Sequence, residues 1–221
     1  MRLSELASGF SISPAHADPD ILGISENSQR IQPGMKIVIA GGSGFLGSPL
    51  AEMYAEDGHD VRVLTRSLAP GETRHDPGTG VPGISRVGWT VDGNSGPWAS
   101  VVEAADAVIN LSGESLAAKR WSTETKKRLR DSRLLATRSL AVAIKAAAVP
   151  PAVFISGSAV GYYGPSDNRP LTESDAAGSD FLATICAEWE AEARLAQRDN
   201  MSNTSAKTRC KIDVVSAFRR S

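Results

Sequence analysis

Cysteine is scarce in this chain, and its two cysteines, Cys186 and Cys210, do not make a disulfide framework. A reducing compartment is therefore expected, which places the protein in the cytoplasm. Long apolar runs are also missing, because no stretch approaches the roughly 18 residues that a membrane-spanning helix needs. The net charge is only −1, so no overall field draws the protein to nucleic acid or to an anionic membrane. What remains, 41% hydrophobic and 22% charged residues, is typical of a globular protein.

Residues 1–34 differ in composition from the rest of the chain. They are rich in serine and proline, show no clear periodicity, and lack the basic start and apolar core of a signal peptide. We interpret them as a disordered leader or as an over-extended start, with Met35 as the true first residue. A targeting or regulatory arm is the alternative. Residues 35–198 would then form one dinucleotide-binding domain, followed over residues 199–221 by a loop and a final strand.

Beyond the leader, apolar runs of strand length alternate with segments of helical periodicity. The expected strands are residues 36–40, 60–66, 85–89, 106–111, 152–156 and 211–218, and the expected helices are residues 45–57, 122–148 and 178–197. Ser122 is the expected N-cap of the long helix. Residues 67–84 hold several glycines and prolines and are expected to form a loop. Such alternation is typical of an α/β fold, a Rossmann-like, doubly wound parallel sheet covered on both faces.

Three glycines join the first strand to the first helix. Gly41, Gly44 and Gly47 form the pattern G-x-x-G-x-x-G. The first allows a tight exit from the strand, the second lets the backbone approach a pyrophosphate, and the third lets the helix pack closely on the sheet. The helix N-terminus then offers free N–H groups and a partial positive charge to the phosphates. An ordinary βα turn is the alternative, but the flanking strand and helix favour dinucleotide binding.

The end of the second strand bears on the choice of cofactor. Thr65 and Arg66 stand where an acidic residue would accept hydrogen bonds from a free 2′-hydroxyl of the adenosine ribose. An arginine there suits a 2′-phosphate, so we predict NADP(H) rather than NAD(H) as the cofactor. A solvated loop charge is the alternative for Arg66.

Several blocks of the sequence together resemble one known family. They are AGGSGFLG, VLTR, DAVINLSGE, KRWSTETKKRLRDSR, FISGSAVGYYG and FLATICAEWEAEA, spread over residues 35–198. They are similar to the atypical, extended-like short-chain dehydrogenases/reductases described as NAD-dependent epimerase/dehydratase family proteins, some of which are labelled SulA-like cell division inhibitors. The glycine block is shared by the whole superfamily, whereas the KRW…DSR and SAVGYYG blocks are much more specific.

The resemblance implies a Rossmann fold with NADP(H) lying across the strand ends. It implies that the pyrophosphate side is bound by Gly41, Gly44, Phe45, Leu46 and Gly47. The adenosine phosphate would face Thr65 and Arg66. The nicotinamide ribose would lie along Leu111, Ser112 and Gly113. Ser158 matches the serine or threonine that orients substrate just after the fifth strand. Relatives also continue past the last strand into a substrate-covering region, which this chain is expected to lack.

One motif of that family is absent. Its members normally use Tyr-x-x-x-Lys, in which the tyrosine moves a proton while the lysine lowers the tyrosine's pKa and holds the ribose. The three tyrosines of this chain have no lysine four positions later, where the residues are Gly58, Ser166 and Asp167. In the helix that should carry the motif, Leu182 and Cys186 occupy the approximate positions. The resemblance therefore supports cofactor binding better than it supports any reaction.

Other residues remain as candidates for acid–base chemistry. Tyr162 and Tyr163 follow Ser158 closely at the carboxyl end of a strand, where α/β proteins bind ligands. Aromatic packing of a loop is the alternative for both tyrosines. Cys186 falls on the buried side of its helix, where an inert thiol is favoured over a nucleophile. The three histidines show no metal-ligand spacing, so no metal site is predicted.

Arg133 completes the set of catalytic candidates. The long helix carries an apolar stripe that should face the sheet, and Arg133 lies on this stripe four residues after Leu129. A charge that points inward needs a partner. A bound anion or phosphate is one alternative, and an acidic side chain is the other. The remaining charges between residues 119 and 138 form a solvated helix face, without the interleaved aromatic residues of a nucleic-acid surface.

Together these features favour an NADP(H)-dependent oxidoreductase or epimerase-like protein that acts on an unidentified small molecule. The alternative is a sensor or interaction protein that binds the dinucleotide without turnover. A third reading is an inactive truncated product with no enclosed substrate site and with apolar surface exposed, which would favour aggregation or partner capture. The dinucleotide and a small molecule are the expected partners, and a homo-oligomer is left open. Neither nucleic acid nor a membrane is expected as a partner.

Overall fold

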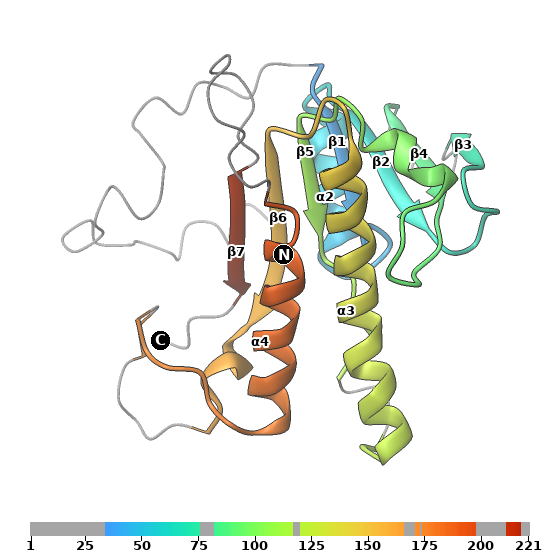
Figure 1. Ribbon diagram of the computed structural model, residues 1–221. Coiled ribbons are helices and arrows are strands. Elements are labelled where there is room, and N and C mark those ends of the chain that lie inside the picture. The colour runs from blue at the N-terminus through green and yellow to red at the C-terminus, as the bar shows by residue number, and fades with distance from the viewer. Residues whose placement is uncertain are drawn as a thin grey trace, which may run out of the picture. The chain divides into compact units, whose positions relative to one another are not determined.

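A mostly parallel β-sheet forms the centre of the chain (Figure 1). The computed structural model describes residues 34–75, 82–116, 120–165, 171–172 and 174–197, and for residues 211–217 the backbone alone. The strands are β1 (Lys36–Ala40), β2 (Asp60–Thr65), β3 (Thr73–His75), β4 (Ile84–Gly88), β5 (Ala107–Asn110), β6 (Val153–Ala159) and β7 (Lys211–Ala217). Their order in the sheet is β3-β4-β2-β1-β5-β6-β7. The expected leader, up to residue 33, and the expected loop over residues 199–210 lie outside the described residues.

The order of the parallel strands identifies the fold. Among the described strands, β3 runs antiparallel to its neighbour β4, and the others pair in parallel. Counted along the chain, the six parallel strands have the order 3-2-1-4-5-6 of a doubly wound dinucleotide-binding sheet. The order reverses between β1 and β5, and ligands of such sheets bind in the crevice at that point, beyond the carboxyl ends of the strands. The Rossmann-like fold predicted from the sequence is confirmed.

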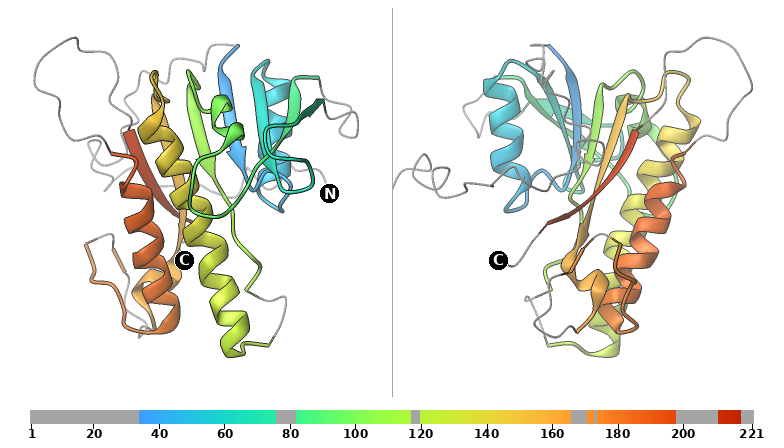
Figure 2. Two further views of the ribbon diagram at one scale, coloured as in Figure 1. Left: turned by 45° about the vertical axis from the view of Figure 1, so that its right-hand side comes forward. Right: turned by 90° about the vertical axis from the view of Figure 1, so that its left-hand side faces the viewer.

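Helices cover both faces of the sheet (Figure 2). On one face lies α2 (Gly47–Glu56), above an apolar cluster that includes Ile37, Ile39, Ala51, Val61 and Val63. The 3-10 helix η4 (Pro97–Val101), α3 (Thr123–Ala146) and α4 (Phe181–Arg194) lie on the other face. The cluster under these helices includes Val38, Trp98, Leu140, Ile144 and Phe154. Because the central strands are buried on both faces, their sequences are continuous apolar runs instead of alternating ones.

The long helix α3 begins beyond the edge of the sheet. Ser122 caps it as predicted, because its hydroxyl accepts a hydrogen bond from the backbone N–H of Thr125 at 3.2 Å. The 24 residues of α3 extend for about 36 Å at 1.5 Å per residue. A five-residue strand such as β1 spans only about 17 Å. The N-terminal turns of α3 therefore project past the carboxyl ends of the strands (Figures 1 and 2).

Two segments differ from the sequence prediction. Residues 67–84 contain β3 instead of loop throughout, and β3 is three exposed polar residues with no apolar alternation to reveal it. The strand predicted over residues 152–156 continues to Ala159, because its last residues pair with β7. Ser158 therefore lies inside β6 and not after it, so that part of the prediction is wrong. The predicted final strand is confirmed as β7, parallel to β6.

Candidate functional site

The turn between β1 and α2 contains three glycines with different surroundings. Gly41 has a φ of +82°, and a Cβ there would lie 2.6 Å from the carbonyl carbon of Leu111. A Cβ on Gly47 would lie 2.6 Å from the Cα of Gly42. A Cβ on Gly44, by contrast, would touch only the carbonyl oxygen of Gly41, at 3.2 Å. Gly41 and Gly47 therefore serve the close packing of backbone, whereas Gly44 leaves open space in front of the turn.

The N-terminus of α2 carries backbone donors that no side chain caps. Leu46 is the N-cap residue of this helix and its side chain makes no capping hydrogen bond, while the N–H of Ser48 donates to the backbone oxygen of Gly44 at 3.0 Å. Phe45 and Leu46 are 93% and 56% exposed, so neither side chain covers the turn by packing into the core. Free N–H groups and the helix dipole suit an anion at this turn. The open space at Gly44 and these donors fit the pyrophosphate of a dinucleotide.

A cavity of about 930 Å³ runs along the carboxyl ends of the strands. Its size lies within the roughly 300–1,000 Å³ of small-molecule sites. Seven of the predicted cofactor residues line it, namely Gly41, Gly44, Thr65, Arg66, Leu111, Ser112 and Gly113. The other three predicted cofactor residues, Phe45, Leu46 and Gly47, are not among its lining residues. The cavity thus joins the turns that follow β1, β2 and β5.

Asn110 fixes the turn after β5 and was not predicted from the sequence. It is fully buried, and its side-chain amide donates to the hydroxyls of Thr137 at 2.8 Å and Ser156 at 3.3 Å. Its side-chain oxygen accepts a hydrogen bond from the backbone N–H of Ser112 at 3.1 Å. The turn that reaches the cavity is therefore tied to both β6 and α3. The sequence feature that could have revealed this role is a polar residue at the end of a buried apolar strand.

Ser112 has a hydroxyl group that suits a ligand in this cavity. Its hydroxyl oxygen is buried and has no hydrogen-bond partner among the described residues. Buried polar groups are normally paired, so an unpaired one invites an explanation. Ser112 lines the cavity, and a ligand hydroxyl or phosphate oxygen there would satisfy it. This observation fits the group that the glycine turn suggests.

Two arginines stand at the β2 end of the cavity. Arg66 follows β2, is exposed and lines the cavity. Arg86 on the neighbouring strand β4 lines the same cavity. Sequence reasoning missed Arg86, because its place beside β2 depends on the strand order of the sheet. Two arginines therefore line this end of the cavity.

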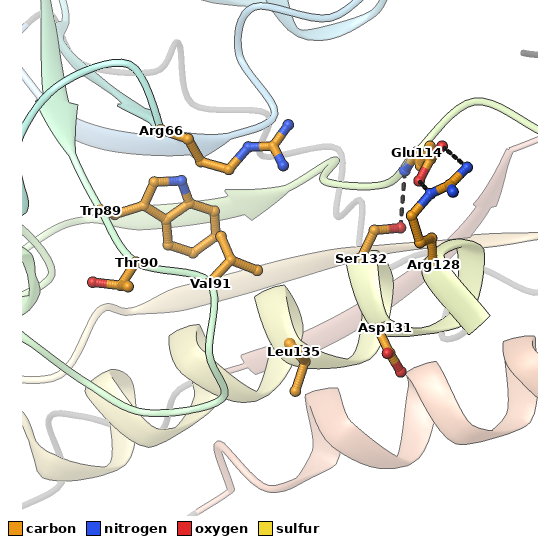
Figure 3. A pocket seen from close by; sticks show the side chains of 9 residues that line it. All are labelled: Arg66, Trp89, Thr90, Val91, Glu114, Arg128, Asp131, Ser132 and Leu135. Carbon is orange, nitrogen blue, oxygen red and sulfur yellow. Dashed lines mark hydrogen bonds and ion pairs between the residues drawn. The ribbon is translucent and has the colours of Figure 1, made fainter. Parts of the chain in front are cut away.

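A smaller pocket of about 460 Å³ shares Arg66 with the cavity (Figure 3). It is lined by Arg66, Trp89, Thr90, Val91, Glu114, Arg128, Asp131, Ser132 and Leu135. Figure 3 shows Arg66 above the Trp89 ring at one end and the Glu114–Arg128 ion pair at the other. The pocket therefore lies between the segment after β4 and the projecting turns of α3. Sequence reasoning identified Arg66 alone among these nine residues.

The described partners of Arg133 are two backbone oxygens and an aromatic ring, and not an acidic side chain. Its guanidinium donates to the backbone oxygens of Leu129 at 2.9 Å and Glu114 at 3.0 Å, and it lies over the Trp189 ring at 5.6 Å. Burial lowers the pKa of Arg133. A Cβ on Gly113 would lie 3.1 Å from its guanidinium carbon. In the described part of the chain, Arg133 thus fastens the turn after β5 to α3 and does not line either pocket.

Ser158 faces α4 and not the cavity. It is 7% exposed, and its hydroxyl donates to Glu190 on α4 at 2.8 Å. The other carboxylate oxygen of Glu190 accepts a hydrogen bond from Arg194 at 3.0 Å. Glu190 was missed because nothing in the sequence pairs position 190 with position 158. The proton of Ser158 is therefore already engaged inside the protein.

The remaining candidates lie near the end of β6. Tyr162 and Tyr163, in the short helix η5 (Val160–Tyr163), pack edge to face with ring centroids 5.2 Å apart. This contact supports the packing alternative for the pair. Cys186 is buried, and burial raises the pKa of its thiol, with a further contribution from the charge of Glu190. A raised pKa disfavours the nucleophilic thiolate, in agreement with the inert reading.

Two features are absent from the described residues. No group of three or more His, Cys, Asp and Glu residues in that part of the chain is placed to hold a metal ion. In the same residues, no helix is both long enough and apolar enough to cross a bilayer.

Comparison with known proteins gives consistent results. The family model described as NAD dependent epimerase/dehydratase family matches residues 37–203. The chloroplastic SDR39U1 homolog of Arabidopsis thaliana, an epimerase family protein, is 33% identical over 205 residues, which cover 89% of this chain and 57% of the relative. Epimerase family protein Mb2239 of Mycobacterium bovis is 38% identical over 174 residues, covering 78% of this chain and 52% of the relative.

A solved structure of a relative agrees with these matches. The crystal structure of human epimerase family protein SDR39U1 (isoform2) with NADPH superposes with a TM-score of 0.59 at 28% identity. The likeness covers 80% of this chain and 52% of the human one. The chain thus spans about half the length of the relatives that it matches. On the family match and on the identity to these relatives, the chain belongs to the NAD dependent epimerase/dehydratase family.

Proposed function

We propose that the chain binds NADP(H) in the larger cavity. The pyrophosphate would lie against Gly44 and the first turn of α2, where the backbone is open and no side chain caps the helix. The unpaired hydroxyl of Ser112 would meet the nicotinamide half. Phe45, Leu46 and Gly47 stay in this proposal as contributors to the pyrophosphate side, through backbone N–H groups. The human relative solved with NADPH supports the choice of ligand.

The preference for NADP(H) over NAD(H) depends on the two arginines. Arg66 and Arg86 line the same end of the cavity, where the adenosine ribose would lie. Glu114 is the one acidic residue among those that line the cavity, and it follows β5, on the far side of β1. No carboxylate would therefore repel a 2′-phosphate at the adenosine end. The exposed Arg66 at the β2 end of the cavity is the observation that carries this proposal.

For the reaction, we propose an oxidoreductase or epimerase-like activity on a small molecule. A bound nicotinamide supplies or accepts the hydride in such chemistry. Because Ser158 donates its proton to Glu190, its oxygen is free only to accept a hydrogen bond from a substrate. Ser158 would therefore orient a substrate hydroxyl by accepting its hydrogen bond, without taking up its proton. Tyr162, Tyr163 and Arg133 stay as proposed contributors near this region, the first two through their phenol groups and Arg133 through the turn that it holds.

A second candidate function is dinucleotide binding without turnover. Two observations favour it: no tyrosine of the chain is followed by a lysine four positions later, and Ser158 is nearly buried. A sensor of the cellular nucleotide pool needs the cavity but not the acid–base groups. For either function, the low cysteine count supports a reducing compartment, and we propose the cytoplasm.

One experiment separates the two functions. Nucleotide released from the purified chain by denaturation would be identified by mass spectrometry. The native chain with NADPH would then be offered aldehydes, ketones and nucleoside-diphosphate sugars while the nicotinamide absorbance is followed. Substrate-dependent loss of absorbance supports the oxidoreductase. Released NADP(H) without any absorbance change across the panel supports the non-catalytic binder, and failure to bind NADPH contradicts both.

A further inference from the structure

Glu114 is the acidic residue among those that line the proposed cofactor site. It lines both the larger cavity and the smaller pocket, and it is acidic in a site where phosphates are expected. It follows β5, whereas Arg66 follows β2, and β1 lies between these two strands. Figure 3 shows the two side chains at opposite ends of the smaller pocket. A dinucleotide centred on the turn after β1 would thus have Arg66 on one side and Glu114 on the other.

The carboxylate of Glu114 is held in position from α3. Arg128 donates to its two oxygens at 3.2 and 3.4 Å. The backbone N–H of Glu114 donates to the hydroxyl of Ser132 at 3.0 Å, and its backbone oxygen accepts from Arg133 at 3.0 Å. Side chain and main chain are therefore both fixed by the projecting turns of the helix. The side chain remains 31% exposed, so a ligand can reach it.

This arrangement leaves the acceptor capacity of the carboxylate half used. Each carboxylate oxygen can accept about two hydrogen bonds, and Arg128 supplies one to each. One acceptor site on each oxygen is left. Two adjacent hydroxyl groups on one sugar ring offer a matching pair of donors. A phosphate offers no donor at neutral pH and would be repelled.

NADP(H) has only one such pair of hydroxyls. Its adenosine ribose carries a phosphate on the 2′-oxygen, so the adjacent 2′- and 3′-hydroxyls are both free on the nicotinamide ribose alone. We infer that Glu114, held by Arg128, accepts hydrogen bonds from the 2′- and 3′-hydroxyls of the nicotinamide ribose. The inference rests on the proposed function, because it assumes NADP(H) in this cavity. It assigns Glu114 a role in orienting the ring that carries the hydride.

A purely structural ion pair is the competing explanation, and it predicts the opposite change in NADPH affinity when Glu114 is replaced. If Glu114 only neutralises Arg128, the Glu114→Gln variant frees a guanidinium beside an anionic ligand. NADPH would then bind more tightly or equally well. If Glu114 accepts from the ribose, the same variant loses a charge-assisted acceptor, and NADPH binds more weakly.

The test compares two ligands on one variant. Adenosine 2′,5′-bisphosphate contains the adenosine end of NADPH but no nicotinamide ribose. We expect Glu114→Gln to weaken NADPH binding by about tenfold and not to weaken binding of the bisphosphate. Retained bisphosphate binding also shows that the variant is folded. Glu72→Gln, at an exposed carboxylate paired with Arg74 and absent from both pockets, is the matched control and should change neither affinity.

The other outcomes overturn the inference. Unchanged or tighter NADPH binding by Glu114→Gln would show a structural ion pair. Equal weakening of NADPH and of the bisphosphate would place Glu114 at the adenosine end or in the fold. If the wild-type chain binds neither ligand, the proposed function itself fails, and this result is distinct from the first two.

Discussion

Gly41 and Leu111 meet where the strand order reverses, and a Cβ on Gly41 would lie 2.6 Å from the carbonyl carbon of Leu111. The turns after β1 and β5 therefore touch through backbone. Asn110 holds the second of these turns from behind, through its bond to the N–H of Ser112. A displacement of either turn moves the other, so the fold and the cofactor site share these residues.

Substitutions of two glycines in the turn after β1 should have different effects. Replacing Gly41 should lower the stability of the fold, and replacing Gly44 should lower the affinity for NADPH. Gly41→Ala places a Cβ against backbone at a φ of +82°, so we expect a loss of about 3 kcal/mol in the free energy of unfolding, measured by urea denaturation. Gly44→Ala meets only one backbone oxygen, at 3.2 Å, and should unfold near the wild-type midpoint. Its Cβ points into the space for the pyrophosphate, so NADPH affinity should fall by more than about tenfold. Wild-type affinity in Gly44→Ala would contradict the assigned pyrophosphate position.

Removal of the Asn110 side chain should destabilise the sheet. Asn110→Ala leaves Thr137, Ser156 and the N–H of Ser112 short of partners in a fully buried place. We expect a cost of about 2–4 kcal/mol in the free energy of unfolding, and weaker NADPH binding because the turn is released. Asn94→Ala, at an exposed asparagine, is the control and should be near neutral. A neutral Asn110→Ala would mean that the network does not hold the turn.

Replacing Ser158 should lower stability and any turnover but should not change the affinity for NADPH. In Ser158→Ala the partly buried carboxylate of Glu190 loses one donor, which should cost about 1–2 kcal/mol in the free energy of unfolding. NADPH affinity should be unchanged, because Ser158 does not line the cavity. Any turnover found for the wild type should fall. Should NADPH affinity fall in parallel with stability, Ser158 would be part of the cofactor contact instead.

Ionisation of the Cys186 thiol should make the stability of the fold fall at alkaline pH. Because its folded-state pKa is raised above the ordinary 9.0, the neutral thiol is favoured by the fold. Its contribution to stability is complete below the pKa of the unfolded chain and is lost as pH rises through that value toward the folded-state pKa. In a Cys210→Ser background, alkylation of Cys186 should be slow at pH 7.5 and rise above pH 9. Cys186→Ala should flatten the alkaline fall in stability relative to that background, and fast labelling at pH 7.5 would contradict the buried assignment.

The strands and helices could be predicted from sequence where their periodicity was strong. Buried apolar runs marked β1 and β5, and Ser122 marked the start of α3. β3 could not be predicted, because three exposed polar residues hold their place only through pairing with β4. The end of β6 was misjudged for the same reason, since small residues such as Gly157 have weak strand preference and are fixed by the β7 ladder.

The cofactor turn could be predicted, but the groups that hold it could not. Gly41 and Arg66 follow strands directly, so local sequence was enough to suggest them. Glu114, Asn110 and Glu190 depend on which elements become neighbours in the sheet and its helical layer. Their partners lie 14 to 46 positions away, beyond the reach of any local pattern.

The most direct test of the account is the 2′-phosphate dependence of binding. The purified chain would be titrated with NADPH and NADH while tryptophan fluorescence is followed, with Trp89 at the pocket wall as a reporter. We predict that NADPH binds at least about tenfold more tightly than NADH, and that Arg66→Ala erases most of this difference, because a charge-assisted pair with phosphate is lost. Equal affinity of the wild type for the two nucleotides, or a preference that survives in Arg66→Ala, would contradict the account.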